Sequence, residues 1–169
     1  MKYANIKLLS DENRFFRFLL LVIWIVGVVL GAALCKPFYS PLMGSALLQS
    51  TSIVGLLAVL FFPLLCTSFS FYLHWPSFLL GLAFGKSVCF GFSAMLILRV
   101  FYSASWLVRI LFLFSDFFTN LFLMILWAVY FSGNRENLEL DFLVCFIALL
   151  AIGLVDYFVI SPFLQGLFW

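Results

Sequence analysis

The chain has 169 residues, of which 66% are hydrophobic and only 9% are charged, and its formal net charge is +2. Soluble domains average about 25% charged residues, so this composition excludes an ordinary soluble domain and indicates a protein that resides in a lipid bilayer. The net charge is too small to support nucleic-acid binding, and no nucleic-acid partner is expected.

Five apolar stretches predict spanning helices. About 20 apolar residues cross the hydrocarbon core, and backbone exposed to lipid must satisfy its own hydrogen bonds. The sequence therefore predicts one all-α membrane domain over residues 1–169, a polytopic transmembrane helical bundle. The expected spans lie near 15–35, 52–71, 77–99, 117–131 and 141–160, after a cytoplasmic segment at 1–14.

The first span follows MKYANIKLLSDENRFFR, and its apolar run is longer than the roughly 7–15 residues of a secretory signal. Basic residues gather just before this span, which predicts a cytoplasmic N-terminus in the cell membrane. With five spans, the C-terminus is then expected outside. Gly27 and Gly31 are spaced for close helix packing in this span. In the second span, Pro63 is expected to kink the helix, because it lacks a backbone donor.

The third span contains GLAFGKS, from Gly81 to Ser87, which looks like a phosphate-binding loop. It is one residue shorter than G-x-x-x-x-G-K-[ST], and no soluble strand precedes it, so nucleotide binding is not predicted. Small residues at this spacing let helix backbones approach closely in lipid. We therefore predict that Gly81 and Gly85, together with Gly91, serve helix packing.

Lys86 lies within this apolar run, where a lysine costs about 2.5–3.5 kcal/mol on insertion scales. It should therefore face protein or water and have a partner. Asp156 in the last span is the first choice, Asp116 the second, and Asn120 could add a hydrogen bond. An ion pair that only fixes helix packing is the favoured interpretation. The alternative is a polar site for a solute or a proton in transit.

Residues 105–131 are too many for one simple span and too few for two. The polar sequence SDFFTN, from Ser115 to Asn120, interrupts the apolar run. We predict an interfacial or re-entrant helix over 105–114 that leads into a short span at 117–131. A single long tilted helix is the alternative.

Sequence motifs for chemistry are missing: there is no HExxH, no GxSxG and no set of metal ligands at coordinating spacing. Neither an enzyme nor a cofactor nor a metal site is expected. The four cysteines lie far apart without a CxxC pair, which favours free thiols. Aromatic residues near the expected span ends predict an interfacial belt; these are Trp75, Tyr102, Trp106, Tyr130, Tyr157 and Trp169.

Four segments resemble the stage II sporulation protein M family. IVGVVLGAAL resembles its opening helix, and SFLLGLAFGKSVCFGF resembles its middle helix. LFLFSDFFTNLFLMILWAVYFSG resembles the segment in which the family often has a Pro-His or Pro-Gln break, where this chain has Ser115 and Asp116; Asn120 replaces the acid that some members carry. LLAIGLVDYFVISPFL resembles the family's ending, with Asp156 and Pro162 at matching positions.

This resemblance implies a bacterial membrane scaffold or accessory subunit that works with cell-envelope proteins. The leading functional prediction is therefore a scaffold that binds other membrane or cell-envelope proteins, or further copies of itself. The alternative is a small-solute transporter, or the membrane subunit of one, with an intramembrane Lys/Asp site. Pro63 and the SDFFTN segment favour this alternative, because broken helices line transport sites. A wet cavity around Lys86, rather than a closed ion pair, would distinguish the two.

Overall fold

The computed structural model describes residues 2–38, 53–73, 75–102, 105–131 and 138–168, and the side chains of 14–36, 61–73, 75–102, 105–131, 139–164 and 166. Every regular element in these residues is helical. The elements are α1 (Lys2–Phe38), α3 (Ile53–Leu73), α4 (Pro76–Val100), α5 (Trp106–Phe131), α6 (Leu138–Val155), the π-helical turn η1 (Asp156–Ile160) and α7 (Ser161–Phe168).

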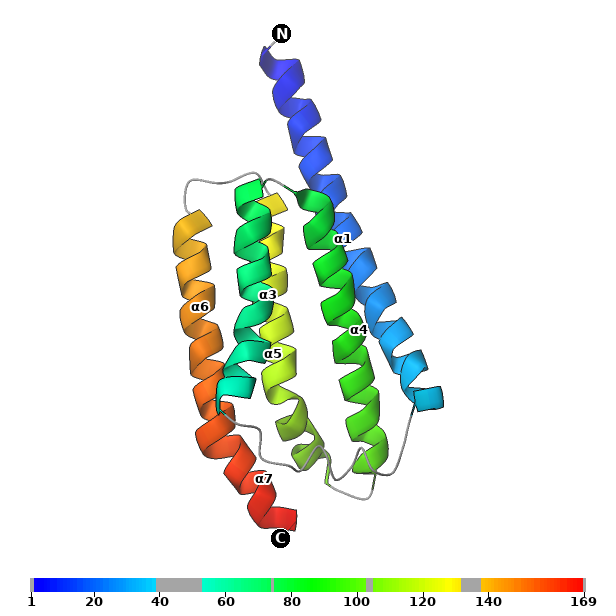
Figure 1. The fold of residues 1–169 in the computed structure, drawn as a ribbon. Coiled ribbons are helices and arrows are strands. Elements are labelled where there is room, and N and C mark those ends of the chain that lie inside the picture. The colour runs from blue at the N-terminus through cyan, green and yellow to red at the C-terminus, as the bar shows by residue number, and fades with distance from the viewer. Residues whose placement is uncertain (1, 39–52, 74, 103–104, 132–137, 169) are drawn as a thin grey trace.

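The long helices alternate in direction from one to the next, and the two chain ends lie at opposite ends of the bundle (Figure 1). The N-terminal part of α1 extends beyond the other helices. Tight connections support this arrangement where they are described. Between α3 and α4, the Ser70 hydroxyl donates to the carbonyl oxygen of Trp75 over 2.8 Å, and the Trp75 amide donates to the Ser70 carbonyl over 3.1 Å.

Four helices in the described part of the chain are long and apolar enough to cross a membrane: Arg14–Lys36, Pro76–Val100, Trp106–Phe131 and Glu139–Leu164. The all-α bundle is thus confirmed, and its composition is that of an integral membrane protein in contact with lipid. The α3 backbone covers 21 residues, the length that the second predicted span requires. Because the side chains of 51–60 lie outside the described residues, this fifth span stays a prediction. His74 and residues 39–52 lie outside them too.

The preferred prediction for residues 105–131 is wrong, because α5 is one continuous helix of 26 residues. Asp116 and Asn120 are four residues apart and lie on one face of that helix. The Asn120 side-chain amide donates to the carbonyl oxygen of Asp116 over 2.7 Å, so it hydrogen-bonds within its own turn. Polar groups that share an inward face need not interrupt the backbone ladder. The single long helix, the alternative reading, is the observed one.

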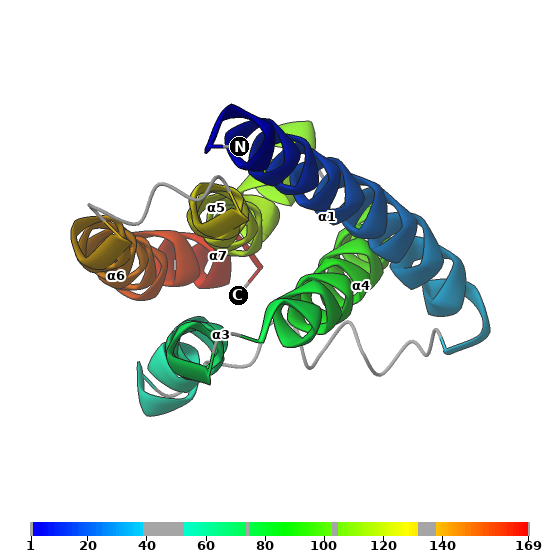
Figure 2. The same ribbon diagram turned by 90° about the horizontal axis from the view of Figure 1, so that it is seen from above.

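Four helices form a ring, in which α3 contacts α4, α4 contacts α5, α5 contacts α6, and α6 contacts α3. Seen from above, α1 lies outside this ring against α4 (Figure 2). Buried apolar side chains pack between these helices, and their core includes Leu79 and Ala83 of α4, Leu123 of α5 and Leu149 of α6. Partly buried side chains continue this core toward the start of α5, at Phe118 and Phe114.

Small residues bring α1 and α4 into close contact. A Cβ added at Gly27 would collide with the Ser87 hydroxyl, and one at Gly31 would collide with the carbonyl oxygen of Val88. From the other side, a Cβ on Gly91 would collide with the carbonyl oxygen of Val28. Only glycine allows this backbone approach.

Gly81 and Gly85, by contrast, do not take part in this packing. An added Cβ at either position would meet nothing within 4 Å, so neither glycine packs against another helix in the described part of the chain. The reason is rotational: successive residues turn by about 100° around a helix, so Gly85 lies nearly opposite Ser87. The buried seam of α4 therefore runs through Ser87 and Gly91.

The last candidate span contains a wide turn that the sequence analysis did not predict. In η1 the Ser161 amide donates to the carbonyl oxygen of Asp156, five residues earlier. Pro162 follows directly; it has no N–H, and its ring would clash with the carbonyl four residues back in an α-helix. A π-helical turn widens the backbone there. Beyond it, α7 packs Leu164 against Val108 at the start of α5.

Two further predictions can be compared with the described residues. The ribbon of α3 changes direction in its first half (Figure 1), consistent with the kink expected from Pro63 inside this helix. Tyr130, however, is not part of an exposed aromatic belt. Its ring is buried and stacks on Phe71 with centroids 4.4 Å apart. Tyr130 faces the ring interior, whereas Tyr102 is 81% exposed.

Candidate functional site

A cavity of about 600 Å³ lies among α3, α4 and α5. Its position follows from the ring, because the lining residues come from three adjacent helices. The described residues that line it are Phe62, Pro63, Lys86, Cys89, Phe90, Ser93, Asp116 and Asn120. Four of them, namely Lys86, Asp116, Asn120 and Pro63, are residues that the sequence analysis selected.

Helix geometry explains how α4 presents its part of the lining. Lys86 is followed by Cys89, Phe90 and Ser93 at the spacing i+3, i+4 and i+7, which places all four on one face. Ser87 lies on the neighbouring face against α1, where its hydroxyl donates to the carbonyl oxygen of Phe84 over 2.8 Å. One side of α4 therefore packs against α1, and the adjacent side lines the cavity.

The α5 residues lie at a matching height. The α4 helix ends, and the antiparallel α5 begins, at the same end of the bundle. Counted in residues, Lys86 and Asn120 are equally far from that end. Asp116 lies one turn closer to that end. Both charged side chains are half-buried, whereas Asn120 is only 4% exposed. A cation and an anion are thus held near the middle of two candidate spans.

The charged groups do not form the predicted ion pair. Among the side chains that the structure describes, no carboxylate oxygen lies within 4.0 Å of the Lys86 ammonium nitrogen. Asp156, the first choice of partner, does not line the cavity. Asp116, the second choice, does line it, but without a direct contact to Lys86. Neither expected partner therefore forms an ion pair with Lys86, and of the two only Asp116 shares its cavity.

Asp156 lies elsewhere, near Ser115 and Asp116 of α5. This arrangement arises because η1 packs against α5. Asp156 is therefore close to α5 but is not part of the lining of the cavity.

Aromatic rings form the apolar part of the site. Phe90 lies between Trp24 of α1 and Phe117 of α5, with ring centroids 6.3 Å from each. Phe62, on the other side of the cavity, is 65% exposed, so the cavity reaches the outer surface of the bundle. The site therefore combines two charges, two neutral polar side chains and an aromatic wall.

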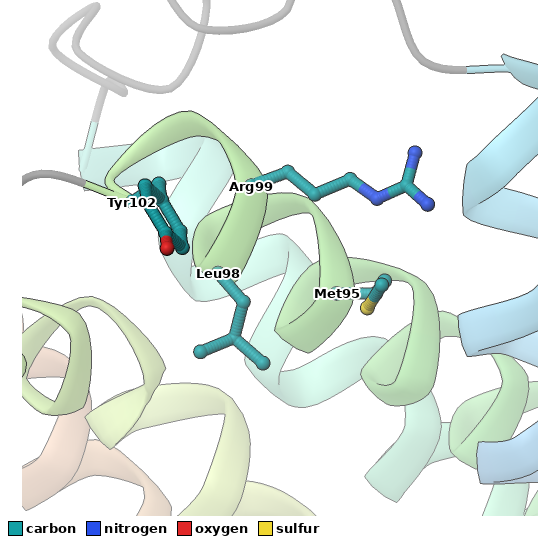
Figure 3. A pocket seen from close by; sticks show the side chains of 4 residues that line it. All are labelled: Met95, Leu98, Arg99 and Tyr102. Atoms are coloured by element: carbon teal, nitrogen blue, oxygen red, sulfur yellow. The ribbon is translucent and has the colours of Figure 1, made fainter.

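A second hollow, of about 510 Å³, lies at the C-terminal end of α4 and is lined by Met95, Leu98, Arg99 and Tyr102. Figure 3 shows the Arg99 side chain extending away from Leu98 and Tyr102. Nearby, an Arg109 guanidinium nitrogen donates to the carbonyl oxygen of Tyr102 over 3.1 Å. Basic and exposed aromatic residues at a span end are typical of the membrane interface. This hollow is therefore distinct from the mid-membrane cavity.

The sequence analysis missed Phe62, Cys89, Phe90 and Ser93 as lining residues. For the three on α4, the i+3, i+4 and i+7 spacing from Lys86 was a usable signal. For Phe62, the only signal in the sequence was its position next to Pro63. Among the described side chains, no three His, Cys, Asp or Glu residues lie close enough together to hold a metal ion.

Comparisons with protein-family profiles, curated proteins and solved structures give no match for this chain. The resemblance to the stage II sporulation protein M family therefore stays a prediction, which rests on the four segments quoted for it.

Proposed function

We propose that this integral membrane protein binds a small polar solute in the Lys86 cavity, as a transporter or as the membrane subunit of one. The observation that carries this proposal is a cavity of about 600 Å³ that has Lys86 and Asp116 on its lining but no direct ion pair between them. A closed pair would have supported a purely structural role. Ligand sites typically measure about 300–1,000 Å³, with a few polar groups on a mostly apolar lining.

The energetics point in the same direction. A charged side chain inside a membrane is expensive unless it meets an opposite charge, a polar group or water. Two such groups on one cavity are compensated when a polar solute enters. Pro63 lies on the lining as well, and a proline inside a continuous helix leaves a backbone carbonyl without its amide donor at membrane depth.

Uptake into proteoliposomes tests this function. The protein is reconstituted and supplied with the small-molecule fraction of cells grown on uniformly labelled glucose, and retained label is identified by mass spectrometry. Wild-type vesicles are expected to accumulate at least one solute above empty vesicles, and Lys86→Met is expected to abolish that uptake. Lys36→Met is the matched control, because Lys36 is an exposed lysine in the last turn of α1. No accumulation by the wild type would overturn the proposal.

A membrane scaffold of the sporulation protein M type is the second candidate. The observation that favours it is the exposed, unfilled surface at Gly81 and Gly85, where a helix from another cell-envelope protein could approach closely. Affinity purification from native membranes should then recover a stoichiometric partner. Gly85→Leu is expected to lose that partner, whereas Gly166→Leu, at a similarly open glycine near the C-terminus, should retain it. Recovery of no stoichiometric partner with the wild type would contradict this role.

A further inference from the structure

We infer that the solute held in the Lys86 cavity is a small zwitterion, with its carboxylate toward Lys86 and its ammonium group toward Asp116. This inference rests on the proposed solute-binding function and specifies its substrate class. Lys86 and Asp116 are the only charged residues among the described lining side chains, and they carry opposite charges. The lining is thus electrically neutral as a whole but divided into a positive and a negative part.

The separation of the two charges selects for a ligand that has both signs. Because the Lys86 ammonium nitrogen has no carboxylate oxygen of a described residue within 4.0 Å, neither charge is neutralised by direct contact with the other. A simple anion would pair with Lys86 but leave Asp116 uncompensated. A simple cation would do the reverse. Only a molecule that carries both groups compensates the two half-buried charges at once, and a charge left uncompensated away from water is costly.

The positions of the two charges fix the orientation of the ligand. Lys86 lies on α4 and Asp116 on α5, so the two ends of the ligand are attracted to different helices. The polar side chains of Asn120 and Ser93 on the lining carry no charge. The ammonium group of the ligand is expected on α5, and its carboxylate on α4.

The apolar lining limits the rest of the ligand. Phe90 is held between Trp24 and Phe117, and Phe62 and Pro63 face it from α3. Ser93 is the one hydroxyl among the described lining residues. These walls suit a short, largely apolar side chain and provide little for a sugar or a phosphate. The chemistry is that of a free amino acid.

The test compares matched ligands on the purified full-length protein in nanodiscs. The probes are the twenty L-amino acids and, for each one that binds, the carboxylic acid that lacks its amino group and the amine that lacks its carboxylate. Binding is measured by isothermal titration and by ligand-induced thermal stabilisation. We expect at least one amino acid to bind, and each half-ligand to bind at least about tenfold more weakly, which corresponds to roughly 1.4 kcal/mol.

Variants assign the two ends of the ligand. Lys86→Met should weaken binding of the amino acid and the acid but leave the amine unchanged, and Asp116→Asn should do the opposite. Lys86→Arg keeps the positive charge and should retain binding, which separates a loss of charge from a loss of fold. Since the ligand series on the wild type needs no variant, the inference stays testable if a variant fails to fold.

Three results have distinct meanings. Tight binding of an amino acid together with weak binding of both half-ligands supports the inference. If a half-ligand binds as tightly as the amino acid, and Lys86→Met loses this binding, the zwitterion assignment is overturned but the solute site remains. If no probe binds and the vesicles accumulate no solute from the labelled extract, the proposed function itself is overturned.

Discussion

Trp127 of α5 donates its indole N–H to the Thr67 hydroxyl of α3 over 3.0 Å, and Thr67 donates in turn to the carbonyl oxygen of Pro63 over 2.7 Å. Thr67 is fully buried, and Trp127 is 1% exposed. The α3 and α5 segments are thereby joined across the ring interior, one turn along α3 from a residue that lines the cavity. This link holds the α3 wall of the site against α5.

Thr67→Val should therefore destabilise the bundle by about 1 kcal/mol, because it keeps the side-chain shape but leaves the Trp127 N–H without its acceptor. The measurement is an unfolding titration with sodium dodecyl sulfate in mixed micelles, followed by circular dichroism. Ser68→Ala is the control, since it removes the neighbouring hydroxyl on the same helix and is expected to change stability less. Equal effects of the two variants would contradict a special role for this link.

Adding one methyl group to the glycines should separate the two glycine pairs. Gly31→Ala is expected to cost about 1–3 kcal/mol, because the new Cβ would collide with the backbone of α4 and force α1 outward. Gly85→Ala has open space around it, so it should be neutral or gain up to about 1 kcal/mol from helix propensity. The same unfolding titration compares them. A loss of stability in Gly85→Ala of the protein alone would contradict the assignment of that face as unoccupied.

Two adjacent leucines in α6 test which face of this helix is the core. Leu149 is fully buried, whereas Leu150 is 37% exposed. Leu149→Ala should cost about 2–5 kcal/mol through lost contacts and a residual cavity. Leu150→Ala is expected to cost less than 1 kcal/mol, because lipid replaces the lost contacts about as well as protein does. A larger loss of stability in Leu150→Ala than in Leu149→Ala would contradict the rotation of α6 in the ring.

Cys89 offers a chemical measure of water in the cavity. It is exposed and lines the cavity three residues after Lys86, whereas Cys35 and Cys145 are buried. A small charged methanethiosulfonate reagent modifies thiols that water can reach. In native membranes Cys89 should react before the two buried cysteines. If the fastest thiol modification is unchanged in Cys89→Ser, a cysteine other than Cys89 is the accessible one.

The amino-acid sequence alone determined the class of this protein and most of its helix positions. Apolar runs such as 15–35 and 77–99 can be read directly, because the thickness of the hydrocarbon layer fixes how many residues a span needs. The sequence also marked Lys86, since the cost of a charge in lipid does not depend on which helices surround it. Asp116, Asn120 and Pro63 were identified for similar local reasons, and all three line the cavity.

The tertiary structure alone decided how each helix is rotated and which residues therefore meet. Gly81-x-x-x-Gly85 and Ser87-x-x-x-Gly91 have the same small-residue spacing, yet only the second pair packs against α1. Likewise Asp116 and Asp156 are both acids in apolar runs, but only Asp116 lines the cavity with Lys86, whereas Asp156 lies in the wide turn before Pro162. Spacing along a helix specifies which residues share a face. Which face turns inward depends on contacts summed over all the neighbouring helices, and no single segment contains that information.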